Sequence, residues 1–293
     1  STDFESCARD EHGFAIMGNS GGTTYKLWQK KNGGGAHSGT RSWKTNGAGK
    51  NYRDDTREAL RIPRFIGFDT ISGAEIRFWH KFDFAPGDGG QVQYFKNGNW
   101  ITLGSVIPLP DYPNWYGNPN FGGSQIAGLG DEPGFTGNSN GWVFSSYPLG
   151  FMNNNTSPLA MRFVLGANAS ANSTGWEIDD FELYVPPQYS AGPTDIQTIA
   201  NLPFPGDNQL MVKIENSGAR ALDSCLLTVW ADNVLIGSQM SRFDPPLQRG
   251  KTRWDTIVNI WPNATSGAHN VCAYTQFPNG RTNDDFSADD SLC

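Results

Sequence analysis

Charged residues are scarce in this 293-residue chain, at 17% of the sequence. Lys and Arg together number 22 and Asp and Glu 29, which gives a formal net charge of −7. No block of Lys or Arg occurs, and this argues against binding to nucleic acid or to an anionic membrane surface. No apolar run approaches the roughly 18 residues of a membrane-spanning helix, so we expect no membrane insertion.

Cysteine is also scarce. The four cysteines, Cys7, Cys225, Cys272 and Cys293, form no C-x-x-C pair and have no Cys/His spacing suited to zinc. Cys225 and Cys272 both lie in alternating segments of the C-terminal region, so we predict a disulfide between them across facing strands. Four cysteines allow three connectivities, and buried free thiols are a further alternative.

We predict an extracellular protein, secreted and in some settings attached to a cell surface. Disulfides are typical of this compartment, and a start at Ser1 without Met or an apolar leader is typical of a processed chain. Five N-x-S/T triplets fit the same location, although an Asn-rich surface also forms them by chance. The triplets begin at Asn154, Asn155, Asn168, Asn172 and Asn263.

Glycine and proline are abundant by contrast, at 35 and 18 residues, which is too turn-rich for a helical protein. Aromatic residues make up 13% of the chain, enough apolar surface for real cores. Residues 185–193 contain three prolines and a glycine and break the periodicity of the sequence. We therefore predict two domains, residues 1–187 and 188–293.

The first domain shows the alternation of half-buried strands. Between residues 74 and 84, apolar side chains occupy every second position and charged side chains most of the others. His80 falls on the apolar face, where we expect a hydrogen-bonded packing residue rather than a catalytic one. Asn97-Gly98 predicts a type I′ hairpin turn, because that turn needs positive φ twice. The predicted fold class is all-β, with a jelly-roll β-sandwich first.

A change of phase marks the last strand of this domain. Trp176 and Ile178 are apolar at even positions, whereas from Phe181 onward the apolar positions are odd. A strand changes face only through an extra residue, so we predict a β-bulge at Asp179-Asp180. Two adjacent carboxylates with no Lys or Arg nearby in the sequence favour a bound calcium ion, with solvation by water as the alternative.

Short alternating runs also follow residue 193. They are separated by Gly, Asn, Asp or Pro turns, and such spacing over about 100 residues indicates an immunoglobulin-like β-sandwich. The runs cover residues 210–215, 225–231, 234–237, 257–261 and 270–275.

Motifs of catalysis are few. Residues 18–22 and 137–141 both fit G-x-S-x-G, but neither lies between a buried strand and a helix, as a nucleophile elbow requires. No sequence pattern places an Asp beside any of the four histidines, and there is no H-E-x-x-H zinc motif. We expect no enzymatic activity, with a hydrolase as the alternative.

An aromatic and polar loop spans residues 108–123. Within it, Tyr112, Trp115, Tyr116 and Asn118 combine ring faces with hydroxyl and amide groups. This chemistry stacks on sugar faces and hydrogen-bonds sugar hydroxyls, so we predict these four as ligand-binding residues. The competing interpretation is that the rings cap one end of the sandwich.

Several motifs occur in a characteristic order along the chain. They are AHSGTRSWKT at 36–45, AEIRFWHKFDF at 74–84, DGGQV at 88–92, GWV at 141–143 with SY at 146–147, and GWEIDDF at 175–181. In this order they resemble the jelly-roll accessory domain of immune inhibitor A-type secreted peptidases and the cleaved adhesin domain of gingipains, and more distantly the MAM domain. The region after residue 193 resembles a CARDB-type immunoglobulin-like module.

The resemblance implies a β-sandwich that binds calcium structurally through its first and last strands. Carried over to this chain, the ligands are Asp3, Glu5, Asp179 and Asp180, the last two on the predicted bulge. The peptidase domain of that family is missing here, so no proteolytic activity carries over.

One functional expectation and two alternatives result. We expect a secreted, non-catalytic adhesion or binding protein of a bacterial cell surface, stabilised by Ca²⁺, whose partner is a cell-surface glycan or protein. The first alternative is a self-assembling subunit of an extracellular filament or surface layer, with copies of itself as partners. The second is an accessory region of a secreted hydrolase.

Overall fold

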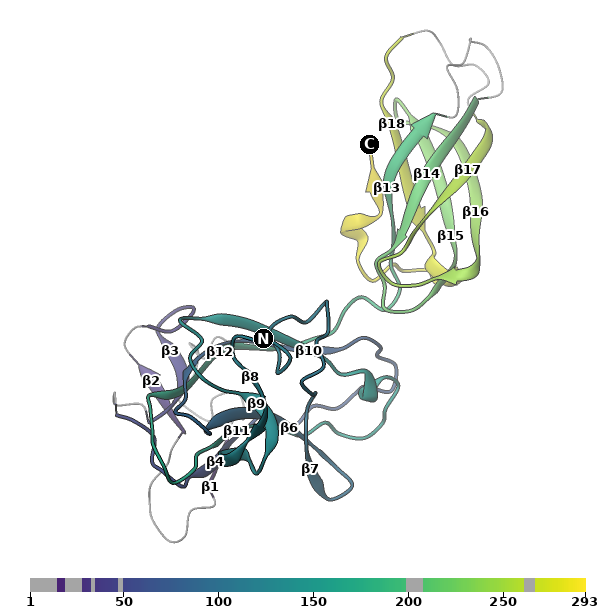
Figure 1. Cartoon of the computed structure of the whole chain (residues 1–293). Coiled ribbons are helices and arrows are strands. Elements are labelled where there is room, and N and C mark those ends of the chain that lie inside the picture. The colour runs from purple at the N-terminus through teal and green to yellow at the C-terminus, as the bar shows by residue number, and fades with distance from the viewer. Residues whose placement is uncertain (1–14, 19–27, 33–34, 47–49, 199–207, 261–266) are drawn as a thin grey trace. The chain divides into compact units, whose positions relative to one another are not determined.

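The computed structural model describes the chain except for residues 1–14, 19–27, 33–34, 47–49, 199–207 and 261–266 (Figure 1). It divides into two compact units, Ser1–Val185 and Pro186–Cys293, so the observed division lies two residues before the predicted boundary. The regular elements in the described residues are strands and short 3₁₀ helices, and the predicted all-β fold is confirmed. None of the helices in that part of the chain is long and apolar enough to span a membrane.

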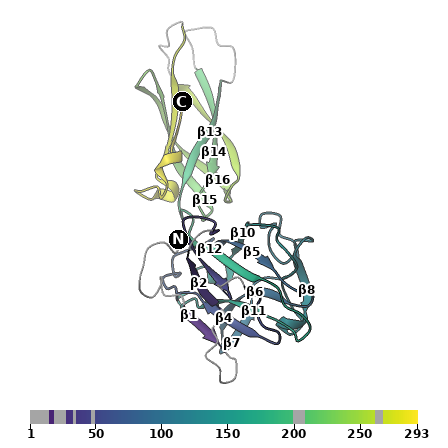
Figure 2. The same ribbon diagram turned by 90° about the vertical axis from the view of Figure 1, so that its left-hand side faces the viewer.

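Two antiparallel sheets build the N-terminal unit (Figure 2). The seven-stranded sheet has the order β1-β4-β11-β6-β9-β8, with β7 paired to β6, and the five-stranded sheet has the order β10-β5-β12-β3-β2. The predicted hairpin is confirmed, because Asn97 and Gly98, with φ of 51° and 82°, join β6 to β7. The strands are β1 (Ala15–Gly18), β2 (Trp28–Asn32), β3 (Arg41–Thr45), β4 (Arg57–Arg61), β5 (Glu75–Asp83), β6 (Gly89–Lys96), β7 (Asn99–Thr102), β8 (Gly122–Ile126), β9 (Glu132–Phe135), β10 (Val143–Pro148), β11 (Met161–Gly166) and β12 (Gly175–Tyr184).

Aromatic rings fill the space between these two sheets. On β5, Ile76, Phe78 and Phe82 are buried, as the alternation of the sequence predicts. The Phe78 ring meets Phe163 of the other sheet at a centroid distance of 5.0 Å, and Phe163 meets Trp176 of β12 at 5.5 Å. Burial of each such ring contributes roughly 1.5–3 kcal/mol, which holds the sheets face to face.

His80 lies within this aromatic core. Its Nδ1 accepts the indole N–H of Trp176 over 3.1 Å, and its Nε2 lies 2.8 Å from Ser145 Oγ. Because Nδ1 is the acceptor, Nε2 carries the proton and donates it to Ser145, whose hydroxyl in turn donates to the Asn114 carbonyl over 2.6 Å. The structure therefore gives His80 the packing role that its position predicts.

The predicted β-bulge in β12 is confirmed. The register of β12 with β5 shifts between Asp179 and Glu182, and Asp180 has a φ of 46°. The extra residue turns the strand over, so that Ile178 before it and Phe181 after it are both buried.

The C-terminal unit is a second sandwich, of one three-stranded and one four-stranded antiparallel sheet. The strand orders are β13-β14-β17 and β16-β15-β18-β19. Val212 and Ile214 of β14 share one buried core with Leu227 and Val229 of β15. This arrangement is that of the immunoglobulin-like sandwich predicted for the region. The strands are β13 (Ala191–Thr198), β14 (Asn208–Asn216), β15 (Leu222–Ala231), β16 (Val234–Leu247), β17 (Thr252–Ile260), β18 (Val271–Gln276) and β19 (Ser291–Leu292).

The predicted disulfide between Cys225 and Cys272 is wrong. Cys272 of β18 is bonded to Cys293, and Cys225 of β15 is a buried free thiol. The two strands are neighbours, as the prediction assumed, but their register places Cys272 opposite Trp230, five residues from Cys225. Odd positions of β15 from Cys225 onward point into the core, so the two cysteines also lie on opposite faces of the sheet.

Candidate binding site

The aromatic loop at residues 108–123 does not present its rings to a ligand. Trp115 and Tyr116 are only 3% and 1% exposed and belong to the core of the N-terminal unit. The Trp115 indole N–H donates to the Leu103 carbonyl over 3.0 Å, and the Tyr116 hydroxyl oxygen accepts the Val92 N–H over 2.6 Å. The prediction that these two rings bind a ligand is therefore wrong, because packing buries them at one end of the sandwich.

Tyr112 and Asn118 of the same loop use their polar groups within the protein. The Tyr112 hydroxyl donates to Glu75 Oε1 over 3.1 Å. The Asn118 side-chain amide donates to the Pro113 carbonyl over 3.2 Å, and its Oδ1 accepts the Asn120 N–H over 2.9 Å. The four predicted ligand-binding residues are thus not brought together as a site, and Asn118 braces a turn.

Ser139, in the second G-x-S-x-G segment, is held by the backbone around it. Its hydroxyl donates to the Gly141 carbonyl over 2.7 Å and accepts the Phe82 N–H over 2.9 Å. These bonds give the hydroxyl a structural role, since they engage its proton and one of its two lone pairs. Most of the first segment, residues 18–22, lies outside the described residues.

The two carboxylates of the bulge bind His37 and Ser38. Asp179 is fully buried, and its Oδ2 accepts the backbone N–H groups of His37 and Ser38 over 2.9 and 3.2 Å. Its Oδ1 accepts the N–H of Asp180 over 2.9 Å. Burial raises the pKa of Asp179 to about 6, although these three N–H donors act to lower it.

The side chain of Asp180 binds the same two residues, His37 and Ser38. Its Oδ1 accepts the Ser38 hydroxyl over 2.6 Å, and its Oδ2 lies 2.6 Å from His37 Nδ1. These hydrogen bonds stabilise the two carboxylates. The sequence predicts that a bound cation does so. Asp3 and Glu5, the other two predicted calcium ligands, lie outside the described residues, and calcium at the bulge stays a prediction.

An exposed aromatic groove lies on the outer face of the four-stranded sheet of the C-terminal unit. The register sets Leu235, Trp230 and Cys272 side by side on β16, β15 and β18, and Thr228 beside Tyr274 in the next row. The Trp230 and Tyr274 rings meet edge to face at a centroid distance of 6.5 Å. The groove has a volume of about 590 Å³, which lies within the range of small-ligand sites.

The lining of this groove is uncharged. Its members carry aromatic rings, amides, two hydroxyls, an aliphatic side chain and a disulfide sulfur, and none has a formal charge, in a chain of net charge −7. Trp230 is 37% exposed and Leu235 is 49% exposed, so apolar surface is accessible there. The lining residues are Thr228, Trp230, Asn233, Leu235, Asn270, Cys272, Tyr274 and Gln276.

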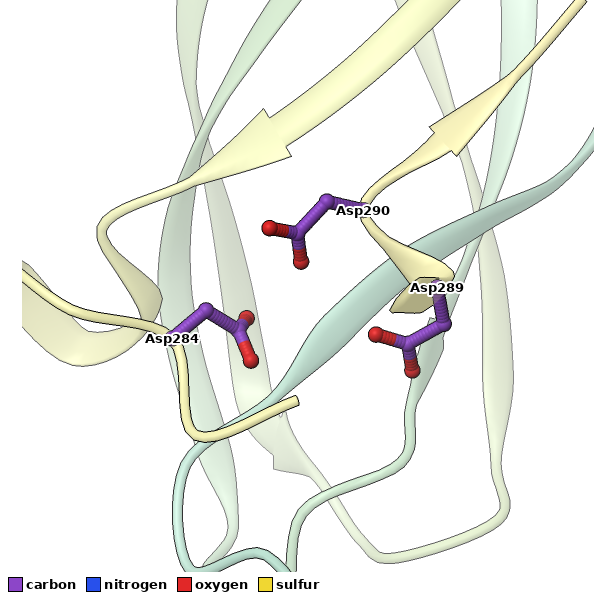
Figure 3. A group of neighbouring side chains, drawn as sticks. All are labelled: Asp284, Asp289 and Asp290. Carbon is purple, nitrogen blue, oxygen red and sulfur yellow. The ribbon is translucent and has the colours of Figure 1, made fainter. Parts of the chain in front are cut away.

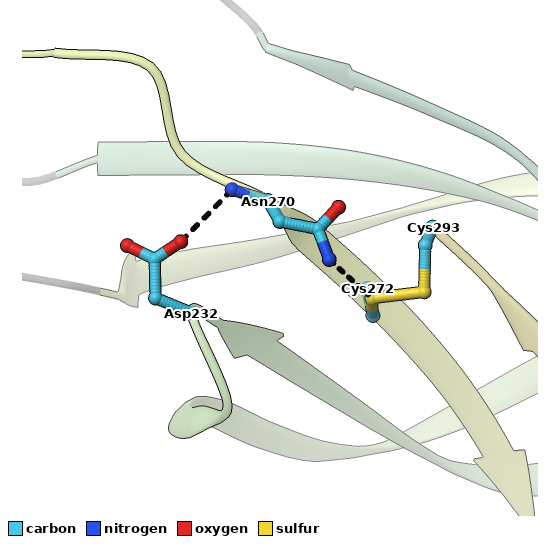
Figure 4. The surroundings of a disulfide bond; sticks show 4 residues. All are labelled: Asp232, Asn270, Cys272 and Cys293. Carbon is cyan, nitrogen blue, oxygen red and sulfur yellow. Dashed lines mark hydrogen bonds between the residues drawn. A yellow bond between two sulfur atoms is a disulfide. The ribbon is translucent and has the colours of Figure 1, made fainter.

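Asp232 and the disulfide lie on either side of Asn270, and Asn270 and Cys272 both line the groove (Figure 4). Asp232 and Asn233, with φ of 48° and 68°, form the two-residue turn between β15 and β16. Asp232 Oδ1 accepts the Asn270 N–H over 3.0 Å, and its Oδ2 lies 2.6 Å from His269 Nδ1. The Asn270 side-chain amide reaches Cys272 Sγ at 3.6 Å, beside the disulfide. Two amide residues of the lining are thereby held in position.

One feature of the sequence indicates this surface: an aromatic residue at an outward position of a strand, outside the aromatic loop. Cys225, Leu227 and Val229 take the inward positions of β15, so Trp230 stands at an outward position, where a polar residue is usual. A large ring on the outward face of a strand is exposed unless another element covers it.

Three carboxylates converge near the end of the chain (Figure 3). Asp284, Asp289 and Asp290 each place an oxygen within 4.8 Å of the others. Asp289 accepts the Ser190 hydroxyl over 3.1 Å, and Asp284 accepts the Ala191 N–H over 3.1 Å, so the cluster ties the C-terminal segment to the start of β13. Burial, and then the charges of the two neighbouring carboxylates, raise the pKa of Asp290 to about 7.

No family model and no curated protein matches this sequence. Among solved structures, the Endo-D glycoside hydrolase domain from Streptococcus pneumoniae R6 is 10% identical, with a TM-score of 0.32, over 89% of this chain and 34% of that one. The chain thus spans about a third of that domain. The adhesin domain of Epf from Streptococcus pyogenes is 10% identical, with a TM-score of 0.27, over 92% of this chain and 81% of that one. Similarity at this level assigns no activity to this chain.

Proposed function

We propose that this chain is a secreted, non-catalytic binding protein that holds a neutral cell-surface glycan in the groove of its C-terminal unit. The observation that carries the proposal is the pair of rings of Trp230 and Tyr274, which stand on neighbouring strands and are flanked by amide side chains. Aromatic rings cover the apolar face of a sugar, and amides both donate to and accept from sugar hydroxyls.

The rigidity and the neutrality of the groove support this choice of ligand. The rings project from a hydrogen-bonded ladder rather than from a loop, so little conformational entropy is lost on binding. A charged ligand would lose its hydration there without gaining an ion pair, because no lining residue is charged. The lining itself holds neither carboxylate nor histidine, and the nearby Asp232 carboxylate is engaged by Asn270 and His269, which supports binding rather than cleavage of a glycan.

Secretion and calcium belong to the same proposal. The Cys272–Cys293 disulfide supports an oxidising, extracellular location. The carboxylates of Asp179 and Asp180 are oxygen donors of the kind that calcium prefers, and an ion bound there would stabilise the bulge.

Self-assembly is the second candidate function, and the edge of the same sheet favours it. β16 is an edge strand on which Val234, Leu235 and Met240 are 64%, 49% and 45% exposed. An edge with apolar side chains can pair with a second copy of the chain, as in a filament. Pro245 and Pro246 lack N–H groups and restrict such pairing to the first part of the strand.

A glycan array probed with the full chain tests the first candidate, followed by calorimetric titration of the best neutral ligand. Trp230→Ala should weaken that affinity at least tenfold, because a central stacked ring typically contributes about 2 kcal/mol or more. Trp254→Ala is the matched control. Trp254 is 36% exposed, as against 37% for Trp230, but it lies on β17 in the other sheet.

Equal binding by the two variants, or an array silent for neutral glycans, would contradict the glycan proposal. Light scattering of the chain alone then addresses the second candidate. A mass that grows with concentration would support self-assembly, and Leu235→Lys on the exposed edge should stop the growth by adding charge. A constant monomer mass would contradict the filament.

A further inference from the structure

A small polar pocket in the N-terminal unit contains one lysine without an ion-pair partner among the described residues. The pocket lies on the outer side of the five-stranded sheet, where the register sets Glu177 of β12 between Lys44 of β3 and Lys81 of β5. Its volume is about 210 Å³, below the roughly 300–1,000 Å³ of sites for drug-sized ligands. It therefore suits a single sugar unit better than a chain.

The charge of Glu177 is already balanced within the protein. Glu177 is 1% exposed, and its Oε1 accepts the Ser42 hydroxyl over 2.5 Å and lies 3.4 Å from Lys31 Nζ. Its Oε2 lies 3.3 Å from Lys81 Nζ, so two ammonium groups pair with one carboxylate. Oε2 is itself buried and receives no hydrogen bond of good geometry from the described residues, so the Lys81 ammonium is its charged neighbour.

Lys44 is the surplus cation of this group. Burial lowers the pKa of its ammonium; the charge of Glu177 opposes this, and the charges of Lys31 and Lys81 add to it. An ammonium that is partly desolvated and close to two other cations is stabilised when an anion approaches it.

The remaining walls supply neutral hydrogen-bonding groups. One wall consists of Asn138, Ser139 and Gly141, held to β5 through the N–H of Ser139. Thr174, directly before β12, lies on another. Asp83 is the second acid of the lining, and its Oδ2 accepts the Ser173 hydroxyl over 2.5 Å. Lys31 of β2 lies outside the lining but pairs with Glu177. The group of Lys31, Lys44, Lys81, Glu177 and Asp83 therefore has a net charge of +1.

We propose that this pocket binds a sugar acid, whose carboxylate pairs with Lys44 and whose hydroxyls bond to the neutral polar groups of the walls. A sugar acid carries both groups on one ring, at the scale of the pocket. The pocket belongs to the N-terminal unit and shares no residue with the groove of Trp230. The inference therefore goes beyond the proposed function and does not rest on it.

Ligand-observed NMR titration of the full chain with glucuronate and with glucose tests the pocket, because the two sugars differ in the carboxylate. We expect glucuronate to bind at least tenfold more tightly, since a charge-assisted hydrogen bond typically contributes about tenfold or more. Lys44→Gln should abolish the difference, and Lys44→Arg should retain it. Lys96→Gln removes the same charge from an exposed position on β6, in the other sheet, and should change nothing.

Equal binding of the two sugars would overturn the proposal, as would an effect of Lys96→Gln as large as that of Lys44→Gln. Either result would mean that the lysines serve only in the ion-pair network around Glu177. Thermal unfolding checks that each variant folds, and the comparison of the two sugars on the unaltered chain needs no variant. Trp230→Ala separates this site from the proposed function, because it should leave the glucuronate titration unchanged even where neutral glycans no longer bind.

Discussion

The indole N–H of Trp176 donates to His80 Nδ1 over 3.1 Å in the core of the N-terminal unit. Burial lowers the pKa of His80 to about 3, since an imidazolium there would be a charge without hydration. Protonation would also remove the acceptor of the Trp176 bond. His80 is therefore neutral at ordinary pH, and the core of the N-terminal unit requires this neutral form.

Acid should weaken the N-terminal unit through this histidine. Between about pH 6.5 and 3 the unfolded chain takes up a proton on His80 and the folded chain does not. The free energy of unfolding therefore decreases as the pH is lowered, and at pH 4 it is about 3 kcal/mol smaller than at neutral pH. Urea unfolding at both ends of the range should show a smaller acid loss for His80→Gln than for the unaltered chain. Equal losses would assign the effect to other groups.

Asp290 should act in the opposite direction in the C-terminal unit. Its pKa of about 7 means that the folded chain keeps a proton that the unfolded chain has lost above about pH 4. The stability of this unit therefore decreases as the pH rises from about 4 to 7. Hydrogen exchange of β18, corrected for intrinsic rates, should report the decrease. Asp290→Asn should remove it, and a persistent slope in that variant would contradict the prediction.

Reduction of the disulfide should destabilise the C-terminal unit by about 3 kcal/mol, because the bond closes a loop with a sequence separation of 21 residues. Cys293→Ser should have the same effect without reductant. Cys225→Ala removes the buried free thiol and should leave the response to reductant intact. Urea unfolding measures the loss, and peptide mass mapping that found Cys225 cross-linked in the native chain would contradict the assignment.

Asp180→Ala should destabilise the N-terminal unit by about 1–3 kcal/mol, because it removes the acceptor of the Ser38 hydroxyl. It also places Ala at a φ of 46°, which Ala rarely adopts. Asp180→Asn keeps one acceptor and tolerates positive φ, so its loss in calorimetry should be smaller. Equal losses would show that neither the side-chain bond nor the backbone angle matters.

Chelation tests the calcium prediction at the same bulge. The melting temperature of the unaltered chain should fall on addition of a calcium chelator, and that of Asp180→Ala should not respond. Asp290→Asn is the control, because the acidic cluster of the C-terminal unit is a second place where a cation could act. No response in the unaltered chain would mean that hydrogen bonds alone hold the bulge.

The alternation of side chains let the sequence alone determine the local features of this protein. The bulge at Asp179-Asp180 follows from a change of parity, and the burial of His80 follows from the parity of its neighbours. The turn at Asn97-Gly98 follows from backbone φ preferences. Each of these features depends on residues adjacent in the chain, and the period of a strand is strict enough to expose them.

The tertiary structure alone decided which residues meet. Parity states the face of a side chain but not its partner on the next strand. The register of β18 with β19, and not the spacing of cysteines, brought Cys272 beside Cys293. Trp115 lies in a loop, where no periodicity exists, and only the packing of the two sheets buried it. Trp230 and Tyr274 form one surface because β15 and β18 pair, and strand pairing between distant segments is set by the core that both must cover.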